Sequence, residues 1–136
     1  MKRMVWTSAC RTGFEEIDSQ HRLLFAICNE LLEISNPNNQ ELEIKYLLRH
    51  LREYVENHFS FEENFMEEKK YPGTGEHKEK HEQIVSEINY ALTGSATMNE
   101  LKKKLESLLG SWVQEHILIE DKKFSEWAKF HNVAAK

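Results

Sequence analysis

The sequence predicts an all-α fold, namely an antiparallel up-down-up-down four-helix bundle with an irregular N-terminal segment. Apolar residues recur at offsets of three and four along almost the whole chain, and the alternation typical of strands is missing. Breaker-rich segments divide this pattern into four helices joined by short turns, for which a bundle is the common solution. The chain of 136 residues suits one domain over residues 1–136. We expect an arm over residues 1–17 and the bundle over residues 18–131.

The first half of the chain predicts the arm and two helices. Residues 1–17 show no helical period, and Trp6, Phe14 and Ile17 are expected to dock the arm on the bundle. A helix over residues 18–34 and another over residues 40–69 follow, separated by a turn rich in Asn and Pro. Their apolar stripes contain Ile17, His21, Leu24, Cys28 and Leu31, and then Ile44, Leu47, Leu51, Val55, His58 and Glu62.

The second half predicts the remaining two helices. The breaker cluster from Tyr71 to Gly75 introduces a helix over residues 76–92, which closes at residues 93–95. Thr97 with Glu100 three residues later forms a capping-box pattern, so the last helix is expected to start there and run to residue 130. The stripes contain His77, His81, Ile84 and Ile88, and then Leu101, Leu105, Leu109, Trp112, Val113, His116, Phe124 and Trp127.

Composition disfavours several classes of protein. The chain carries 18 Lys and Arg against 23 Asp and Glu, a formal charge of −5, so nucleic acid is not an expected partner. No apolar run approaches the roughly 20 residues that span a bilayer, and the N-terminus lacks the apolar core of a signal peptide. We therefore expect a cytoplasmic protein with no membrane partner. Cys10 and Cys28 show no Cys-x-x-Cys spacing and are expected to be free thiols.

Five of the seven histidines lie on apolar stripes, where a bundle places them in its core: His21, His58, His77, His81 and His116. A single histidine on an apolar face is more often a hydrogen-bonded core residue than a metal ligand. Five of them on four helices, with Glu62 one turn after His58, would leave a large buried polar cluster without a metal ion. The set therefore predicts a metal site. His50 and His131 lack this context and are interpreted as ordinary surface residues.

The ligand types narrow the choice of metal. Imidazole and carboxylate without thiolate suit iron, manganese, copper or zinc. Five histidines and at least Glu62 exceed the four ligands of one tetrahedral zinc, so two ions are predicted. Two rival motifs are absent from the sequence. Lys78 stands where a metalloprotease motif needs Glu, and no His has Glu three residues before it, as ferritin-like di-iron bundles require.

Four segments together carry a resemblance to a known family. They are Ile17-Asp18-Ser19-Gln20-His21, His58-Phe59-Ser60-Phe61-Glu62-Glu63, Tyr71-Pro72 followed by His77-Lys78-Glu79-Lys80-His81, and Trp112-Val113-Gln114-Glu115-His116 followed by Asp121. Each segment alone is weakly specific, but jointly they are highly specific. On these residues the chain resembles the hemerythrin family, in its bacterial single-domain form, over nearly its whole length.

The resemblance implies two iron ions in a non-haem centre with an oxo or hydroxo bridge. It implies that His77, His81 and His116 bind one iron, that His21 and His58 bind the other, and that Glu62 and Asp121 bridge both. Spacing alone does not select Asp121, because Glu120 lies closer to the face of His116 on an ideal helix. We therefore expect the helix to widen locally near residues 117–121, as a π-bulge would give.

Ligand counting extends this implication to function. With six positions per iron and a shared bridge, the three-histidine iron is full and the two-histidine iron has one open position. An open position beside a redox-active pair suits reversible dioxygen binding, so a non-enzymatic oxygen carrier, store or scavenger is expected. A di-iron redox enzyme (an oxidase, a peroxidase-like or a nitric-oxide-handling protein) and an oxygen sensor are the alternatives. The absence of an extra polar or acidic residue evidently aimed at the open position disfavours the enzyme.

Several neighbours of the ligands receive an expected role. Phe59, Val113 and Ile117 are candidate walls of the oxygen pocket, although a plain core role explains each of them equally well. Trp112 is expected to pack on the site. Asp18 is expected to cap the first helix rather than to support a ligand. A monomer is the expected oligomeric state, because no large exposed apolar face is evident from one chain.

Overall fold

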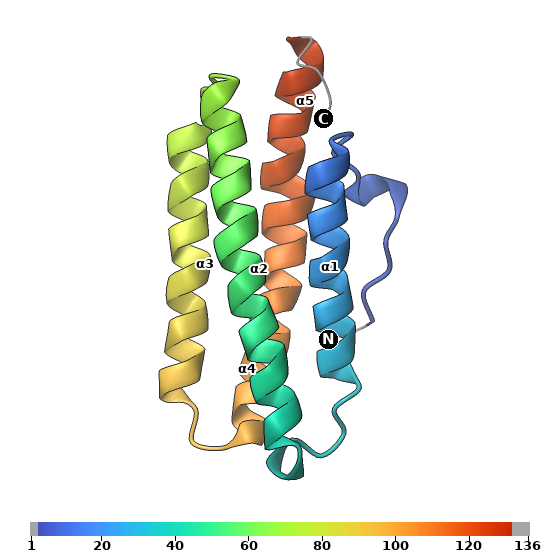
Figure 1. The fold of residues 1–136 in the computed structure, drawn as a ribbon, viewed down its shortest axis with the longest axis vertical. Coiled ribbons are helices and arrows are strands. Elements are labelled where there is room, and N and C mark those ends of the chain that lie inside the picture. The colour runs from blue at the N-terminus through green and yellow to red at the C-terminus, as the bar shows by residue number, and fades with distance from the viewer. Residues whose placement is uncertain (1–2, 132–136) are drawn as a thin grey trace.

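The protein is a four-helix bundle, described by a computed structural model for residues 3–131 apart from the side chain of residue 114. Helices α1 (Glu15–Leu32), α2 (Glu41–Glu68) and α3 (Thr74–Gly94) alternate in direction (Figure 1). The fourth rod is continuous and consists of α4 (Met98–Ser111), the π-helical segment η3 (Trp112–Asp121) and α5 (Lys122–Phe130). Within residues 3–131 no strand is present, so the predicted all-α bundle is confirmed. Residues 1–2 of the predicted arm and residues 132–136 of the predicted domain lie outside the described residues.

Two helices, α1 and α3, differ from their predicted bounds by two or three residues at both ends. α1 begins at Glu15, three residues early, and its first turn carries Glu15, Glu16 and Asp18, whose carboxylates favour the positive end of the helix dipole. The irregular arm therefore ends at Phe14. α3 spans Thr74–Gly94 and so exceeds the predicted helix by two residues at each end. The start of α4 is confirmed, because Thr97 Oγ1 accepts a hydrogen bond from the backbone N–H of Glu100 at 3.1 Å.

The N-terminal arm runs along the outside of α1 and is tied to the bundle by hydrogen bonds (Figure 1). It includes the short 3-10 turn η1 (Ser8–Cys10). Asp18 Oδ1 accepts hydrogen bonds from the backbone N–H and the hydroxyl of Thr12, at 2.8 and 2.7 Å. Ser125 on α5 donates to the carbonyl of Thr12 at 2.5 Å. The predicted capping role of Asp18 is therefore wrong, because this carboxylate lies inside the first turn and binds the preceding loop.

The docking residues of the arm differ in burial. Phe14 and Ile17 are buried, and Ile17 proves to be part of α1. Trp6 is half-buried and packs edge-on against Phe25, with ring centroids 5.3 Å apart.

The turn between α2 and α3 ends α2 with a left-handed residue. Lys70 has φ 59°, and the backbone N–H of Tyr71 donates to the carbonyl of Met66 at 3.0 Å. This is the hydrogen-bond pattern of a Schellman motif, which usually places Gly at the left-handed position. The other connections are residues 33–40, with the short 3-10 turn η2 (Pro37–Asn39), and residues 95–97.

Two apolar clusters lie on either side of a polar layer. The larger contains mostly aliphatic residues of all four rods, among them Leu31, Ile44, Leu51, Leu101, Leu105 and Leu109. The smaller contains Phe14, Ile17, Phe65, Met66, Phe124 and Ala128. Every predicted stripe residue is buried except Ile88 and Trp127, which are half-buried. The helical period therefore predicts the interior of the bundle correctly, including its polar residues.

Candidate metal centre

The seven residues implied as ligands converge between the two apolar clusters, and each is at most 3% exposed. α1 supplies His21, α2 supplies His58 and Glu62, α3 supplies His77 and His81, and η3 supplies His116 and Asp121. Their ligand atoms form two groups, each with all atoms within 4.8 Å of one another. One group contains Glu62, His77, His81 and His116, and the other contains His21, His58, Glu62 and Asp121.

Both carboxylates face the two histidine groups with different oxygens. Glu62 directs Oε1 toward the three-histidine group, where it contacts His77 Nε2 and lies 3.2 Å from His81 Nε2. Its Oε2 lies 3.3 Å from His58 Nε2 in the other group. Asp121 is divided in the same way, with Oδ1 3.1 Å from His77 Nε2 and Oδ2 2.8 Å from His21 Nε2. Each carboxylate is therefore placed to bridge two cations.

The π-helical segment explains why Asp121 belongs to the cluster. Hydrogen bonds in a π-helix join residues five apart, which brings His116 and Asp121 to one face. Glu120, the residue that a regular helix would favour, is half-buried and lies 3.4 Å from Lys123 Nζ. The predicted widening is confirmed, and it begins at Trp112, earlier than expected.

The unpartnered polar atoms of the bundle show that the residues fit metal ions. Among the described residues, eight buried side-chain nitrogen or oxygen atoms have no hydrogen-bond partner. Seven of them belong to His21, His58, Glu62, His116 and Asp121, and the eighth is the Tyr54 hydroxyl. Buried polar groups of this kind are costly unless something else satisfies them. Five of these atoms, namely Nε2 of His21 and His58, Oε2 of Glu62 and both carboxylate oxygens of Asp121, lie in the two ligand groups and would be satisfied by a pair of cations. They are donor types that iron accepts.

The electrostatics of the cluster also favour cations. Burial alone would raise the pKa of Glu62, but His58, His116 and His77 hold this pKa well below its usual range. For Asp121, burial and Glu62 act to raise the pKa, and the surrounding histidines outweigh them and lower it. Conversely, burial acts against protonation of His77, but the adjacent carboxylates of Asp121 and Glu62 raise its pKa to about 10. Two ionised carboxylates thus attract positive charge, whether protons or metal ions.

Two ligand histidines are oriented by neighbours that the sequence analysis missed. His81 Nδ1 lies 2.7 Å from Glu63 Oε2, and His58 Nδ1 contacts Gln20 Oε1. An acceptor at Nδ1 keeps the proton there and leaves Nε2 free to bind a metal. Gln20 directly precedes His21, and Glu63 directly follows Glu62. The only sequence signal for these two residues is their position next to a ligand. Such a position beside an apolar stripe is common among surface residues and does not single them out.

Apolar and aromatic side chains enclose the cluster. The Phe59 ring stacks on the imidazole of His81, with centroids 3.8 Å apart and planes 2° from parallel. Trp112 packs on Phe59 at 5.4 Å, and Val113 and Ile117 are buried in the same apolar cluster. Trp112 therefore packs beside the site as expected, while the roles of Phe59, Val113 and Ile117 as walls of an oxygen pocket stay predictions.

Tyr54 is a further residue that the sequence analysis missed. It lies one turn before His58 on α2, is 4% exposed, and stacks on the His58 imidazole with centroids 5.1 Å apart. Burial and the charges of Glu62 and Asp121 raise its pKa well above the ordinary value. The sequence signal that could have identified Tyr54 is its spacing of four residues from His58, and of His58 from Glu62, which places all three on one helix face.

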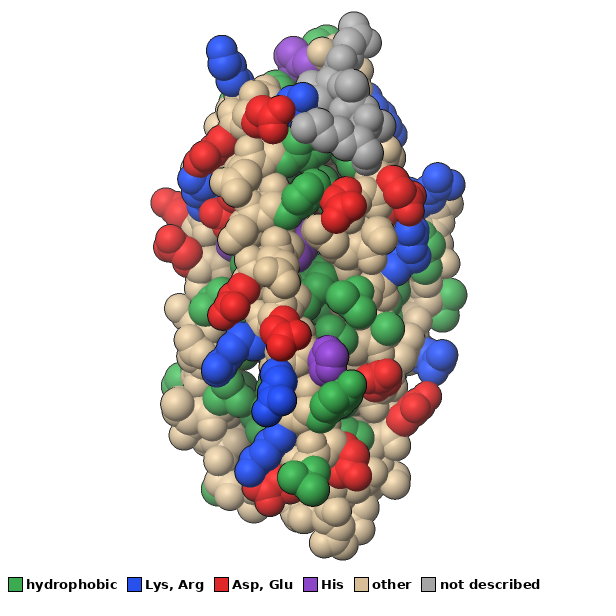
Figure 2. Space-filling view, viewed as in Figure 1, with side chains coloured by type: hydrophobic (Ala, Val, Ile, Leu, Met, Phe, Trp, Pro, Cys, Tyr) green, Lys and Arg blue, Asp and Glu red, His purple; other side chains and the backbone are tan. Residues whose placement is uncertain are grey.

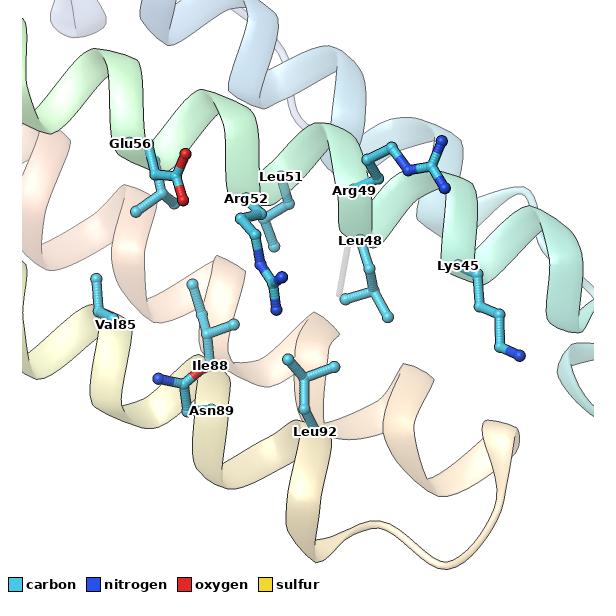
Figure 3. A pocket seen from close by; sticks show the side chains of 11 residues that line it. Lys45, Leu48, Arg49, Leu51, Arg52, Glu56, Val85, Ile88, Asn89 and Leu92 are labelled. Atoms are coloured by element: carbon cyan, nitrogen blue, oxygen red, sulfur yellow. The ribbon is translucent and has the colours of Figure 1, made fainter.

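The remaining histidines and grooves lie away from the cluster. His50 and His131 are exposed and pack on the rings of Tyr46 and Trp127, as expected for surface residues. A groove of about 540 Å³ between α2 and α3 is lined by residues such as Leu48, Arg52 and Ile88 and contains none of the seven ligands (Figure 3).

The surface and the helices show two further features. Acidic and basic side chains are interspersed on the face shown in Figure 2. No helix within residues 3–131 is long and apolar enough to span a membrane. Cys10 and Cys28 are buried free thiols, as predicted.

Comparisons with known proteins agree with this geometry. The family model described as the hemerythrin HHE cation binding domain matches residues 12–128. The bacteriohemerythrin of Stenotrophomonas maltophilia (strain R551-3) is 29% identical over 132 residues, which cover 96% of this chain and 85% of that protein. The bacteriohemerythrin of Clostridium acetobutylicum is 30% identical, with 88% and 97% covered. That of Campylobacter jejuni (serotype O:6) is 31% identical, with 82% and 84% covered.

Proposed function

The chain belongs to the hemerythrin family, and from this premise we propose that it binds dioxygen reversibly at a non-haem di-iron centre. The observation that carries the proposal is the unequal ligation of the two histidine groups around shared carboxylates. His77, His81 and His116 with Glu62 and Asp121 would supply five protein ligands to one iron, whereas His21 and His58 with the same carboxylates would supply four to the other. The two-histidine side is therefore the one that would leave room for an exogenous ligand.

When bound, the iron pair supplies the electrons and the open position that reversible dioxygen binding needs. The chain's own residues hold the geometry and the protonation state. Glu63 and Gln20 fix the ring orientation of His81 and His58, and Glu62 and Asp121 remain ionised acceptors. Phe59 and Ile117 contribute apolar surface beside the ligands, which keeps water from the cluster.

Iron content and reversible spectral change test this proposal. The purified protein should contain about two irons per chain, as two ligand groups imply. Its reduced, oxygen-free form should gain a visible absorption band on exposure to oxygen and lose that band on deoxygenation. Two irons that oxidise without a reversible band, together with steady-state turnover of a reductant, would favour a di-iron redox enzyme. Zinc, or no metal, would contradict the proposed centre.

A further inference from the structure

Tyr54 carries the one unpartnered buried polar atom, among the described residues, that does not belong to an implied iron ligand. Five of the seven other atoms face the two cation positions and would be satisfied by bound metal ions, whereas Nδ1 of His21 and of His116 lies on the ring side away from the cluster. Iron would not by itself satisfy the phenol hydroxyl of Tyr54. A buried hydroxyl without a partner is unfavourable, so its presence in the core requires a partner in the working protein.

The Tyr54 ring packs on the two-histidine side of the cluster. The Tyr54 ring lies 18° from parallel to the His58 imidazole, and both side chains leave α2 on one face, one turn apart. The hydroxyl oxygen at the end of this ring is buried in the interior. The Trp112 ring, 6.0 Å from the Tyr54 ring, covers another side. Tyr54 therefore lies beside the histidine group that would bind the iron with fewer protein ligands.

The Tyr54 side chain lines a small cavity between α1 and α2. This cavity has a volume of about 160 Å³, and Gln20, Ile27, Tyr54, Asn57 and His58 are among its lining residues. The Tyr54 oxygen itself is inaccessible to solvent. The ring thus lines this cavity, whereas the hydroxyl oxygen has no exposed surface there. Water in the cavity is not positioned to satisfy it.

We propose that Tyr54 donates a hydrogen bond to the small ligand that occupies the open position of the two-histidine iron. The inference rests on the proposed function, and it adds the one polar contact that the sequence analysis did not find there. No described side chain and no solvent contact provides an acceptor for this hydroxyl, whereas a diatomic or triatomic ligand with partial negative charge does. Tyr54 is in this sense a specificity-determining residue that favours acceptor ligands.

Tyr54→Phe tests the hydrogen bond, because it removes the oxygen and keeps the ring that lines the cavity and packs on His58. Azide added to the oxidised, iron-loaded protein is the probe, and its dissociation constant is measured by optical titration. We expect roughly five- to tenfold weaker azide binding in Tyr54→Phe, the usual size of one such bond. Tyr46→Phe is the matched control on the same helix, since Tyr46 is 60% exposed, and its azide affinity should equal that of the wild type.

The iron-free proteins supply a second measurement that does not depend on ligand binding. Iron-free Tyr54→Phe should unfold at the same temperature as iron-free wild type or higher, because the deleted hydroxyl has no partner in that state. A lower unfolding temperature would show that the hydroxyl binds within the protein, and this would overturn the inference. Equal azide affinity of Tyr54→Phe and wild type would overturn this inference but leave the proposed function standing. A wild type that holds two irons but binds neither azide nor oxygen would overturn the proposed function as well.

Discussion

The ligand layer and the two apolar clusters beside it are built from the same helices, but burial has opposite consequences in them. Along α2, the chain passes from Leu51 in the larger cluster through His58 and Glu62 to Phe65 in the smaller one. In the clusters, burial removes apolar surface from water and stabilises the fold. In the layer, burial leaves seven side-chain atoms of the described residues without hydrogen-bond partners. The clusters therefore hold the layer in an arrangement that becomes favourable when cations are bound.

Iron removal is expected to have the largest effect on the free energy of unfolding. Ions present at about 1,000 times their dissociation constant stabilise a fold by about 4 kcal/mol. Glu62→Gln keeps the shape of the side chain but removes the charge that both histidine groups face, so most of the iron and of this stabilisation should be lost. Iron per chain, and urea unfolding with and without iron, measure both effects.

The control for this substitution is Glu67→Gln. Glu67 lies on the same helix, and its side chain is 51% exposed and paired with Lys78. Glu67→Gln should hold as much iron as the wild type. If Glu62→Gln retained two irons per chain, Glu62 would not be a bridging ligand, and the contrast between layer and clusters would lose its main support.

A substitution in the larger cluster should act independently of iron. Leu105→Ala deletes a side chain that is 2% exposed and should destabilise the fold by about 2 to 5 kcal/mol. Leu105 lies about 16 Å along its helix from His116, so the loss should be equal with and without iron. Leu42→Ala, at a residue that is 80% exposed, should change stability by less than about 0.5 kcal/mol. A loss confined to the iron-free protein would show that cluster and layer are coupled.

A smaller effect is expected at the edge of the layer, where Asp18 ties the arm to α1. Asp18→Ala removes the acceptor of two short hydrogen bonds from Thr12, at a cost of about 2 kcal/mol. Because the arm is loosened, trypsin should cleave after the exposed Arg11 faster, while iron content stays unchanged. Asp18→Asn keeps one acceptor oxygen and should fall between Ala and the wild type. Loss of iron in both variants would mean that Asp18 supports His21 directly.

The same contrast explains what the sequence predicts well and what it does not. Buried positions recur with the helical period, so the stripe from Ile44 to Glu62 indicates the core and the ligands on it together. Asp121 departs from that period, and only the resemblance to a family selects it over Glu120. The π-helix that brings it inward is a property of the packed fourth rod. Regular periodicity has no means to indicate such a segment.

Other residues were missed because their role depends on a neighbouring helix. Tyr54 is one of many aromatic core residues by pattern, and its orphaned hydroxyl is evident only when α2 is packed. Gln20 reaches His58 from α1 across a helix interface, a contact that spans 38 positions in the chain. Asp18 was misassigned because the expected start of α1 was three residues late, which made a residue of the first turn resemble a cap.

The smallest expected effect lies outside both regions, at the turn between α2 and α3. Lys70 adopts φ 59°, where an L-residue is strained and Gly is not, so Lys70→Gly should stabilise the fold by about 0.5 to 1 kcal/mol. Its neighbour Lys69 has φ −86°, and Lys69→Gly should destabilise the fold by a similar amount because Gly gains freedom in the unfolded chain. Thermal unfolding measures both, and iron content should not change in either variant. Effects of the same sign would show that side-chain contacts, and not backbone strain, set the stability of this turn.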